Sequence, residues 1–208
     1  MEKGDRPTTL FLDIGGVLLT NGWDRSSRRK AAEKFEIDFA EMDERHHLTY
    51  DTFESGKLSL DEYLDRVVFF RKIDCDRNDF KNFMFEQSQA YHDMIELVKE
   101  VKQKYRLKVG VISNEGLELT EYRISKFSLG EFVDFFVSSC FVHLRKPDKD
   151  IYKMALAMAH ASPEESLYVD DRLMFVEIAR SLGIRSVNHV DYQDTKAALE
   201  SFGFYAGL

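Results

Sequence analysis

The sequence predicts an α/β fold, a parallel β-sheet flanked by helices, with an all-helical segment inserted after the first strand. Two observations support this. Strand-length apolar segments alternate with amphipathic helical segments through the second half of the chain, as in a parallel sheet covered by helices. From Ser26 to Gln89, by contrast, the spacing is helical throughout. We therefore expect an α/β domain of residues 1–19 and 91–208 and a helical domain of residues 20–90.

The first strand is predicted within Leu10–Leu19, LFLDIGGVLL, where an apolar run meets Asp13 and is then broken by Gly15 and Gly16. An ionised carboxylate inside an apolar sheet costs several kcal/mol unless positive groups compensate it. We therefore expect Asp13 at the C-terminal edge of the strand, where ligands bind in open α/β sheets. The alternative is that Asp13 only caps the following loop.

The inserted segment has the spacing of four helices, predicted at Arg28–Phe35, Phe39–Phe53, Leu60–Phe70 and Phe80–Phe85. Ser59 and Asp79 are suited to N-caps. An insertion that leaves the C-terminal edge of the first strand lies over Asp13, so it can serve as a lid or as a wall that selects substrates. Its phenylalanines are expected to form a helical core, and part of that surface is a candidate for a substrate pocket or a dimer contact.

The second half of the chain predicts alternating elements. In order these are helix Met94–Tyr105, strand 107–113 (LKVGVIS), helix Leu117–Phe127, strand Phe135–Ser138, helix Lys149–Ala161, strand Ser166–Asp170, helix Leu173–Leu182, strand Arg185–Val187 and helix Thr195–Phe202. Gly183 is placed to end the helix before it.

Composition limits the classes of function. The 208 residues are 44% hydrophobic and 32% charged, as in globular proteins, and no stretch reaches the ~18 apolar residues that cross a bilayer. The first ten residues carry no apolar segment of the signal-peptide type, so we expect a cytoplasmic protein. A net charge of −8 disfavours non-specific binding to nucleic acid or to anionic membranes.

Cys75 and Cys140 are far apart in sequence and lack a CxxC pair, so we expect free thiols and neither a disulfide framework nor a zinc site. A basic cluster is predicted to form the solvated face of a helix, or alternatively to draw an anionic substrate toward Asp13; its members are Arg25, Arg28, Arg29 and Lys30.

Polar residues stand at the ends of three further strand regions: Ser113–Asn114, Lys146–Pro147 and Asp170–Asp171. Each is expected at the same sheet edge as Asp13. Together they supply a carboxylate that can attack, a hydroxyl and an amide that can hold an anion, an ammonium that can neutralise it, and two acids that can hold a cation. These are the groups that phosphoryl transfer requires.

With these motifs the chain resembles the haloacid dehalogenase superfamily of hydrolases over essentially its whole length, through LFLDIGGVL, VGVISN, RKPDKDIY and LYVDD. The resemblance implies a Rossmann-like three-layer core with a helical cap, and it is greatest to the phosphatase-type members. It implies that Asp13 is the nucleophile, that Ser113 and Asn114 bind the transferring group, and that Lys146 neutralises charge. It further implies Mg²⁺ held by Asp13, the backbone carbonyl of Gly15 and Asp171, with Asp170 as an outer or orienting ligand.

The chain departs from the family pattern at Gly15, because phosphatases of the family carry there an aspartate that protonates the leaving oxygen. Such acid–base assistance is typically worth ~10²–10⁴-fold. We therefore expect either a substrate with a good leaving group or a substitute acid from the cap, for which Asp24, His46 and His47 are candidates.

Three functions follow from this departure. The favoured one is a phosphatase acting on a small phosphorylated metabolite. The second is a dehalogenase-type C–X hydrolase that forms an Asp13 ester, with Arg28 or Arg45 as possible substrate-carboxylate ligands. The acid pair Asp170–Asp171 disfavours it, because uncompensated acids beside the nucleophile hinder attack. The third is a magnesium- and anion-binding module without turnover. The substrate, and the choice between monomer and homodimer, are left open by the sequence.

Overall fold

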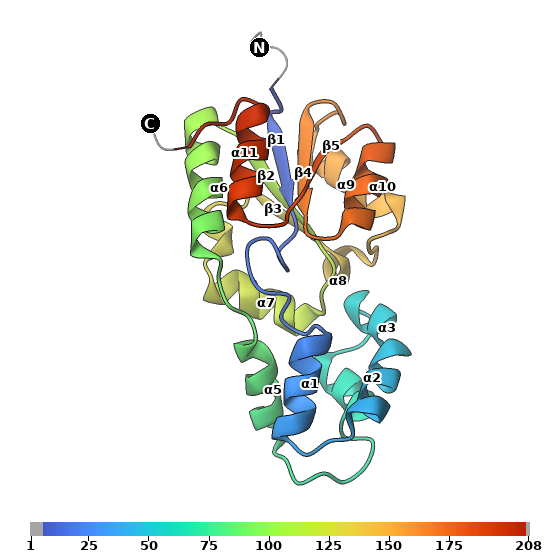
Figure 1. Ribbon diagram of the computed structural model, residues 1–208. Coiled ribbons are helices and arrows are strands. Elements are labelled where there is room, and N and C mark those ends of the chain that lie inside the picture. The colour runs from blue at the N-terminus through green and yellow to red at the C-terminus, as the bar shows by residue number, and fades with distance from the viewer. Residues whose placement is uncertain (1–5, 207–208) are drawn as a thin grey trace.

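A computed structural model of the chain describes residues 6–206 and contains a five-stranded sheet in the order β3-β2-β1-β4-β5 (Figure 1). All four strand pairs are parallel. The strands are β1 (Thr9–Leu12), β2 (Lys108–Ser113), β3 (Phe135–Ser138), β4 (Ser166–Asp170) and β5 (Arg185–Asn188). The predicted parallel α/β sheet is confirmed.

Helices cover both faces of the sheet, as the alternation of buried side chains in β1 requires. Leu10 and Leu12 face an apolar core that includes side chains of α6 (His92–Tyr105) and α11 (Tyr192–Ser201). Phe11 points to the opposite face and belongs to the core shared with α9 (Lys149–Ala159) and α10 (Leu173–Ser181). The core of the fold therefore has three layers.

Three short or connecting elements complete this region: α7 (Leu117–Lys126), the 3₁₀ helix η1 (Leu129–Glu131) and α8 (Ser139–Val142). The periodicity had indicated only the first of them, because segments of three or four residues leave no recognisable period. Gly183 has a φ of +85° and lies two residues after the end of α10, where the sequence predicts a glycine that ends the helix.

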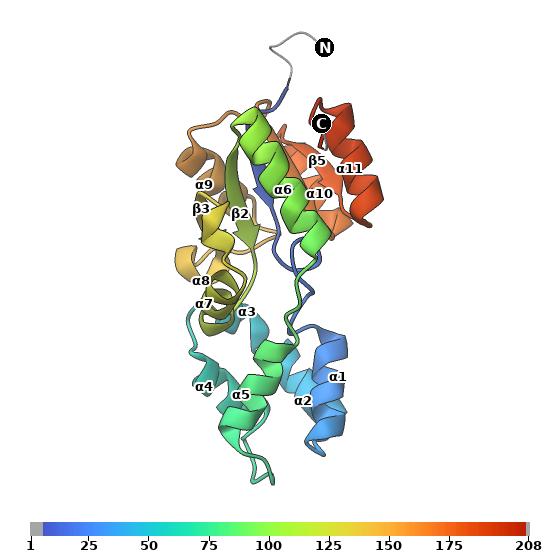
Figure 2. The same cartoon turned by 90° about the vertical axis from the view of Figure 1, so that its left-hand side faces the viewer.

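The inserted segment forms five helices with a second apolar core that includes Met42, Leu64 and Phe80. They are α1 (Arg25–Lys34), α2 (Phe39–His47), α3 (Tyr50–Glu54), α4 (Leu60–Val67) and α5 (Arg77–Glu86). Figures 1 and 2 show these helices together beyond the end of the sheet toward which the strands run. The insertion thus lies where a cap over the strand ends is expected.

The two segments that join this helical cluster to the sheet run side by side. Leu19 forms an antiparallel bridge with Ala90, the Tyr91 amide donates to the Leu18 carbonyl at 2.9 Å, and the Thr20 amide donates to the Gln89 carbonyl at 2.9 Å. This pairing holds the two segments together where the chain leaves the sheet and returns to it.

Two local predictions in the insertion were wrong. The single helix expected at Phe39–Phe53 is interrupted between α2 and α3, where Leu48 is 74% exposed and the Thr49 backbone leaves the helical region. Asp79 lies inside α5, whose N-cap is Asp76, because the helix begins a turn earlier than the apolar periodicity does. The cap expected at Ser59 is confirmed and forms a capping box with Glu62.

Within residues 6–206, no helix combines the length and the apolarity needed to cross a bilayer.

Candidate active site

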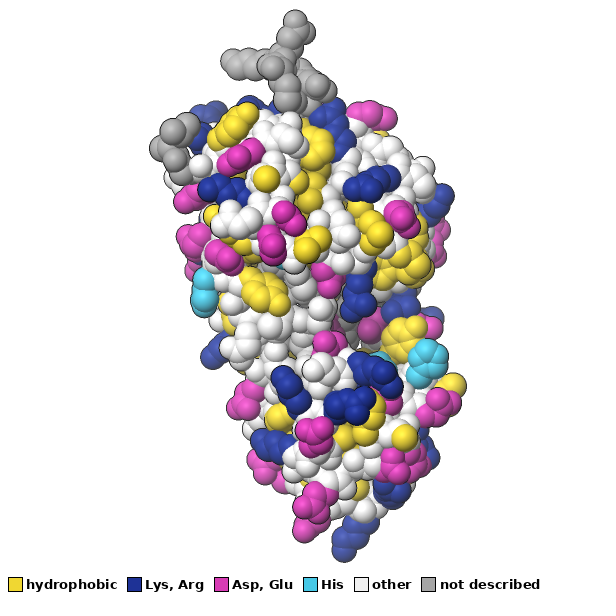
Figure 3. Space-filling view, in the orientation of Figure 1, with side chains coloured by type: hydrophobic (Ala, Val, Ile, Leu, Met, Phe, Trp, Pro, Cys, Tyr) yellow, Lys and Arg dark blue, Asp and Glu magenta, His cyan; other side chains and the backbone are white. Residues whose placement is uncertain are grey.

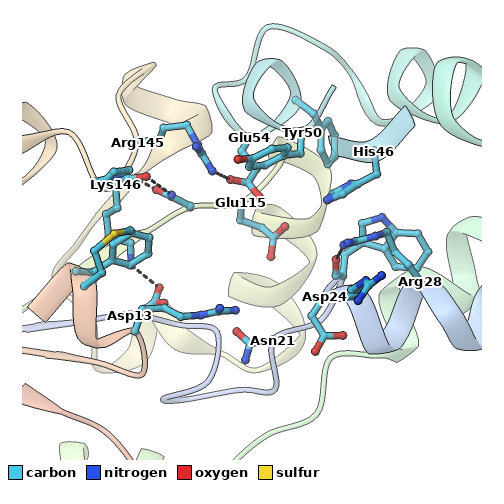
Figure 4. Close-up of a pocket in the computed structure, with 18 of the residues that line it drawn as sticks. Asp13, Asn21, Asp24, Arg28, His46, Tyr50, Glu54, Glu115, Arg145 and Lys146 are labelled. Atoms are coloured by element: carbon cyan, nitrogen blue, oxygen red, sulfur yellow. Dashed lines mark hydrogen bonds and ion pairs between the residues drawn. The ribbon is translucent and has the colours of Figure 1, made fainter. Parts of the chain in front are cut away.

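The strand ends and the inserted helices enclose one cavity of ≈ 640 Å³ (Figure 4). From the sheet edge it is lined by Asp13, Asn114, Glu115, Arg145 and Lys146, and from the insertion by Trp23, Asp24, Arg28, His46, Tyr50 and Glu54. Register explains the convergence. Leu12 of β1 is paired with Val111 of β2 and Val169 of β4, so the residues that follow these strands emerge at the same edge.

Asp13 follows the last residue of β1 and is 8% exposed. Its amide donates to the Val169 carbonyl at 3.0 Å, and its Oδ1 accepts from the Ile14 amide at 2.8 Å. Burial raises the pKa of Asp13 to about 6, the nearby Lys146 ammonium opposes this shift, and the Ser113 hydroxyl also lowers the pKa. Asp13 is thus a fixed carboxylate facing the cavity with one cation beside it.

That cation is Lys146, whose side chain is 1% exposed. Its Nζ lies 3.2 Å from Asp13 Oδ1 and 2.7 Å from Asp170 Oδ2. Burial alone would lower the pKa of Lys146, but the carboxylates of Asp13 and Asp170 more than offset it and hold this pKa above its ordinary value. Lys146 is therefore a permanent positive charge between two acids.

Ser113 ends β2 and is buried, and Asn114 follows it. Both groups of the Asn114 amide are bonded to the Lys146 backbone: Nδ2 donates to the Lys146 carbonyl and Oδ1 accepts from the Lys146 amide, each at 2.8 Å. The side chain of Asn114 therefore holds the Lys146 peptide against the end of β2, a use that the sequence does not reveal.

Three carboxylates, that of Asp13 among them, converge at the ends of β1 and β4. One oxygen from each of Asp13, Asp170 and Asp171 lies within 4.8 Å of the others. Asp170 is hydrogen-bonded through both oxygens: Oδ2 accepts from Lys146 and from the Tyr168 hydroxyl, and Oδ1 accepts from the Arg172 amide at 2.7 Å. Both oxygens of Asp170 therefore already have hydrogen-bond donors.

Asp171 differs from Asp170 in this respect. Its Oδ2 accepts from Asn21 Nδ2 at 3.3 Å, but its Oδ1 is buried and has no hydrogen-bond partner among the described residues. A Cβ at Gly16, which has a φ of +75°, would lie 2.3 Å from Asp171 Oδ2, so only glycine lets this carboxylate take its position. An unpaired buried carboxylate oxygen in a cluster of acids fits an oxygen-ligated cation such as Mg²⁺.

Gly15 lies in the turn between Asp13 and this cluster. A Cβ placed there would approach Asn21 Oδ1 to 3.1 Å and Arg123 Nη1 to 3.9 Å. A side chain at position 15 would therefore begin in contact with Asn21 and close to the guanidinium of Arg123.

Arg123 is itself part of a buried ion pair that sequence reasoning missed. Its Nη1 lies 2.8 Å from Glu115 Oε2, its Nε donates to Ser88 Oγ at 3.0 Å, and its Nη2 donates to the Thr20 carbonyl at 3.3 Å. Burial raises the pKa of Glu115 to about 7, although Arg123 opposes the shift. The sequence signal that could have identified Glu115 is its place directly after Ser113–Asn114 at the end of a strand.

The three cap residues predicted as substitute acids differ in whether they line the cavity and in what their side chains contact. Asp24 lines the cavity but also caps α1 by accepting from the Ser27 amide at 2.8 Å. His46 lines the cavity, yet burial lowers its pKa to about 3, so it is neutral near pH 7 and has no acidic proton to give. His47 is not among the residues that line this cavity. The neutral imidazole of His46 therefore disfavours it as the substitute acid.

The two candidate substrate arginines have partners within the protein. Arg28 lines the cavity but is buried, and its guanidinium binds Asp43 and the Trp23 carbonyl, each at 2.9 Å. Arg45 lies over the Phe70 ring and is absent from the cavity wall. The prediction of a solvated basic face is wrong for Arg28, because that face of α1 packs inside the insertion.

Exposed arginines stand at the edge of the cavity instead. Arg25 and Arg172 line it with side chains that are 69% and 59% exposed. Figure 3 shows lysine and arginine side chains gathered around the narrow junction between the sheet domain and the inserted helices. Two exposed arginines thus stand at the edge of a cavity with an acidic floor.

Ion pairs hold α3 against the sheet domain beside the cavity. Arg145 Nη2 lies 2.5 Å from Glu54 Oε2 and Arg145 also pairs with Asp51. Ser139 Oγ donates to the Glu54 carbonyl at 2.6 Å. The break between α2 and α3 is what allows α3 to reach these partners.

Comparison with known proteins places the chain among hydrolases. A profile described as haloacid dehalogenase-like hydrolase matches residues 7–183. The pyrophosphatase PpaX of Bacillus cereus is 29% identical over 122 residues, which are 59% of this chain and 52% of that protein. The chain thus spans about half the length of the pyrophosphatases it matches. A phosphorylated carbohydrates phosphatase of Thermotoga maritima is 25% identical over 198 residues, 92% of this chain and 90% of that protein.

The fold also matches solved structures. A HAD family enzyme of Bacteroides thetaiotaomicron, solved with magnesium and inorganic phosphate, superposes with a TM-score of 0.73 at 19% identity and covers 87% of this chain and 93% of its own. A predicted HAD-like hydrolase of Porphyromonas gingivalis superposes with a TM-score of 0.74 at 18% identity, covering 94% and 98% of the two chains. At these identities the likeness concerns the fold.

Proposed function

Because the chain belongs to the haloacid dehalogenase-like hydrolase family, we propose that it is a magnesium-dependent phosphatase that acts on a small phosphorylated metabolite through an aspartyl-phosphate on Asp13. The observation that carries the proposal is the unpaired buried oxygen of Asp171 in a cluster with Asp13. Two acids placed so close to a nucleophile hinder attack on an anion unless a cation compensates them.

Each residue at the strand ends has its own role in phosphoryl transfer. Asp13 Oδ attacks phosphorus, and the Lys146 ammonium, 3.2 Å from Asp13, neutralises charge on the transferring oxygens. We assign the Ser113 hydroxyl, which is hydrogen-bonded to Asp13, to holding the same group. Asn114 keeps Lys146 in position through its backbone.

A bound magnesium ion would be held by Asp13, Asp171 and the backbone carbonyl of Gly15, and it would supply positive charge to the transferring phosphoryl group. Asp170 would orient this site from the second layer, since its own oxygens are taken by Lys146, Tyr168 and the Arg172 amide. The exposed arginines Arg25 and Arg172 would attract the anionic substrate toward the cavity.

The proposal is tested with purified protein and a panel of phosphomonoesters, acyl phosphates and 2-haloacids, each with Mg²⁺ and with EDTA. We expect phosphate release that requires Mg²⁺ and is abolished in Asp13→Asn. Asp24→Asn is the matched control, because Asp24 is another cavity acid that already caps a helix. Halide release that persists in EDTA would instead identify a C–X hydrolase, and Mg²⁺ binding without turnover would identify a binding module.

A further inference from the structure

Glu115 is a buried acid in the cavity that the proposed phosphoryl transfer does not yet use. It is 8% exposed, lines the cavity and directly follows Asn114 at the end of β2. Figure 4 shows its carboxylate projecting into the cavity between Asp13 and the inserted helices. Arg123 fixes one of its oxygens at 2.8 Å, and the Gly116 amide donates to the other at 3.3 Å.

An alkyl phosphate needs a proton on its leaving oxygen, and the other acids of the cavity are committed elsewhere. Asp13 is the nucleophile, and Asp24 caps α1. Glu54, like Glu115, is paired with an arginine, but its partner Arg145 also ties α3 to the sheet domain. The imidazole of His46 is neutral near pH 7 because burial lowers its pKa to about 3. Gly15 has no side chain to contribute.

We propose that Glu115 is the catalytic acid of this enzyme, protonating the leaving oxygen and then serving as the base for hydrolysis of the aspartyl-phosphate. This inference rests on the proposed phosphatase function. It also extends the substrate class to alkyl phosphates, since a phosphatase with its own proton donor is not restricted to acyl or aryl phosphates.

The two chemical steps balance with Glu115 in this role. In the first, Asp13 Oδ forms a bond to phosphorus, the phosphorus–oxygen bond to the alcohol breaks, and the Glu115 proton moves to the departing oxygen. In the second, water attacks phosphorus, Glu115 takes a proton from that water, and the bond between phosphorus and Asp13 breaks. The sum is ester plus water to alcohol plus inorganic phosphate, with both acids restored.

Arg123 is a positioning residue in this arrangement. Its Nη1 also lies 3.9 Å from the position that a Cβ at residue 15 would take. The charge of Arg123 is matched by Glu115, from the neighbouring strand end. An acid at position 15 would therefore begin close to the same buried cation.

The charge state of Glu115 near neutral pH follows from its surroundings. Burial raises its pKa to about 7, Arg123 on α7 lowers it, and the acids Glu54 on α3 and Asp13 after β1 raise it. The other titratable groups whose pKa values respond to it are Tyr63 on α4 and Cys140 on α8. A carboxyl group with this pKa is protonated in part of the population at neutral pH and can both give and take a proton.

The test compares a substrate that needs the proton, glycerol 2-phosphate, with one that does not, 4-nitrophenyl phosphate, in the presence of Mg²⁺. Glu115→Gln should lower kcat/KM for the alkyl ester by about 10²–10⁴-fold and for the aryl ester by less than about tenfold. The matched control is Glu54→Gln, another buried cavity acid, which should change both substrates by the same factor. Equal losses in Glu115→Gln, or selective loss in Glu54→Gln, would overturn the assignment.

The pH profile of the wild type keeps the test valid if Glu115→Gln folds poorly with Arg123 unpaired, and a rescue experiment adds a second check. In the wild type, kcat/KM for the alkyl ester should fall tenfold per pH unit above about 7, because Glu115 loses its proton, and the aryl profile should lack this limb. In Glu115→Gln, the added change Gly15→Asp should restore alkyl activity beside Arg123. Identical pH profiles for the two esters would refute the role of Glu115 alone, whereas no phosphate release from either ester would refute the phosphatase proposal itself.

Discussion

Replacing Arg123 by methionine should destabilise the protein far more than removal of an ordinary ion pair. The pair with Glu115 is almost fully enclosed, with side chains 1% and 11% exposed, so the surface value of about 0–1 kcal/mol does not apply. Removing one partner of a buried pair costs about 3–5 kcal/mol, because the remaining charge is left uncompensated. Arg123 also holds Ser88 and the Thr20 carbonyl, which lie in the two segments that join the helical insertion to the sheet.

The assay is equilibrium urea unfolding. With a slope of about 2 kcal/mol per M, the Arg123→Met midpoint should fall by roughly 1.5–2.5 M. A double-mutant cycle with Glu115→Gln isolates the pair, and the double variant should be more stable than the sum of the single losses predicts by at least about 1 kcal/mol. Losses that add within about 0.5 kcal/mol would refute the claim that the two side chains form one buried unit.

Three other predictions concern single groups. Asp171→Asn should weaken Mg²⁺ binding at least about tenfold by calorimetry, while Asp24→Asn should not, and equal affinities would contradict the cation site. The ring resonances of His46 should show no titration between pH 5 and 8, since its pKa is lowered to about 3; a midpoint near 6.5 would contradict its burial. Because the folded pKa of Glu115 is raised from 4.5 to about 7, the stability of wild type relative to Glu115→Gln should fall as pH rises from about 4.5 to 7, by up to about 3 kcal/mol in the free energy of unfolding. A difference that is flat or rises over that range would contradict the raised pKa.

Much of the fold follows from pattern alone, because most β-strands of the core are short apolar runs and the long helices have an apolar face. The convergence of Asp13, Lys146 and Asp170 could be predicted for the same reason, since parallel strands end at a common edge. Local details depend on competition between short signals. Asp76 and Asp79 are both good N-caps, and only the packing of α5 decides between them.

Features that depend on distant partners were beyond prediction. The α3 helix, which follows the break after α2, is paired with Arg145, almost a hundred residues further along the chain. His46 reads as a proton donor in the sequence, but its environment of Tyr63, Arg28 and buried apolar groups keeps it neutral. Asn114 reads as a substrate ligand, yet its amide is used by the Lys146 backbone. The role of Glu115 could not be predicted from the sequence, because it depends on a buried ion pair with Arg123. Arg123 comes from a different element and lies close to Gly15.

The central claim is that Asp13 is phosphorylated during turnover. The most direct measurement is a single-turnover reaction of wild-type protein with 4-nitrophenyl phosphate and Mg²⁺, quenched in acid and analysed by peptide mass spectrometry. We predict one phosphoryl group on Asp13 that forms as nitrophenol is released, decays with the release of phosphate and is absent in EDTA. Nitrophenol release with no phosphoryl group on Asp13 at any time, together with full activity in Asp13→Asn, would contradict the account.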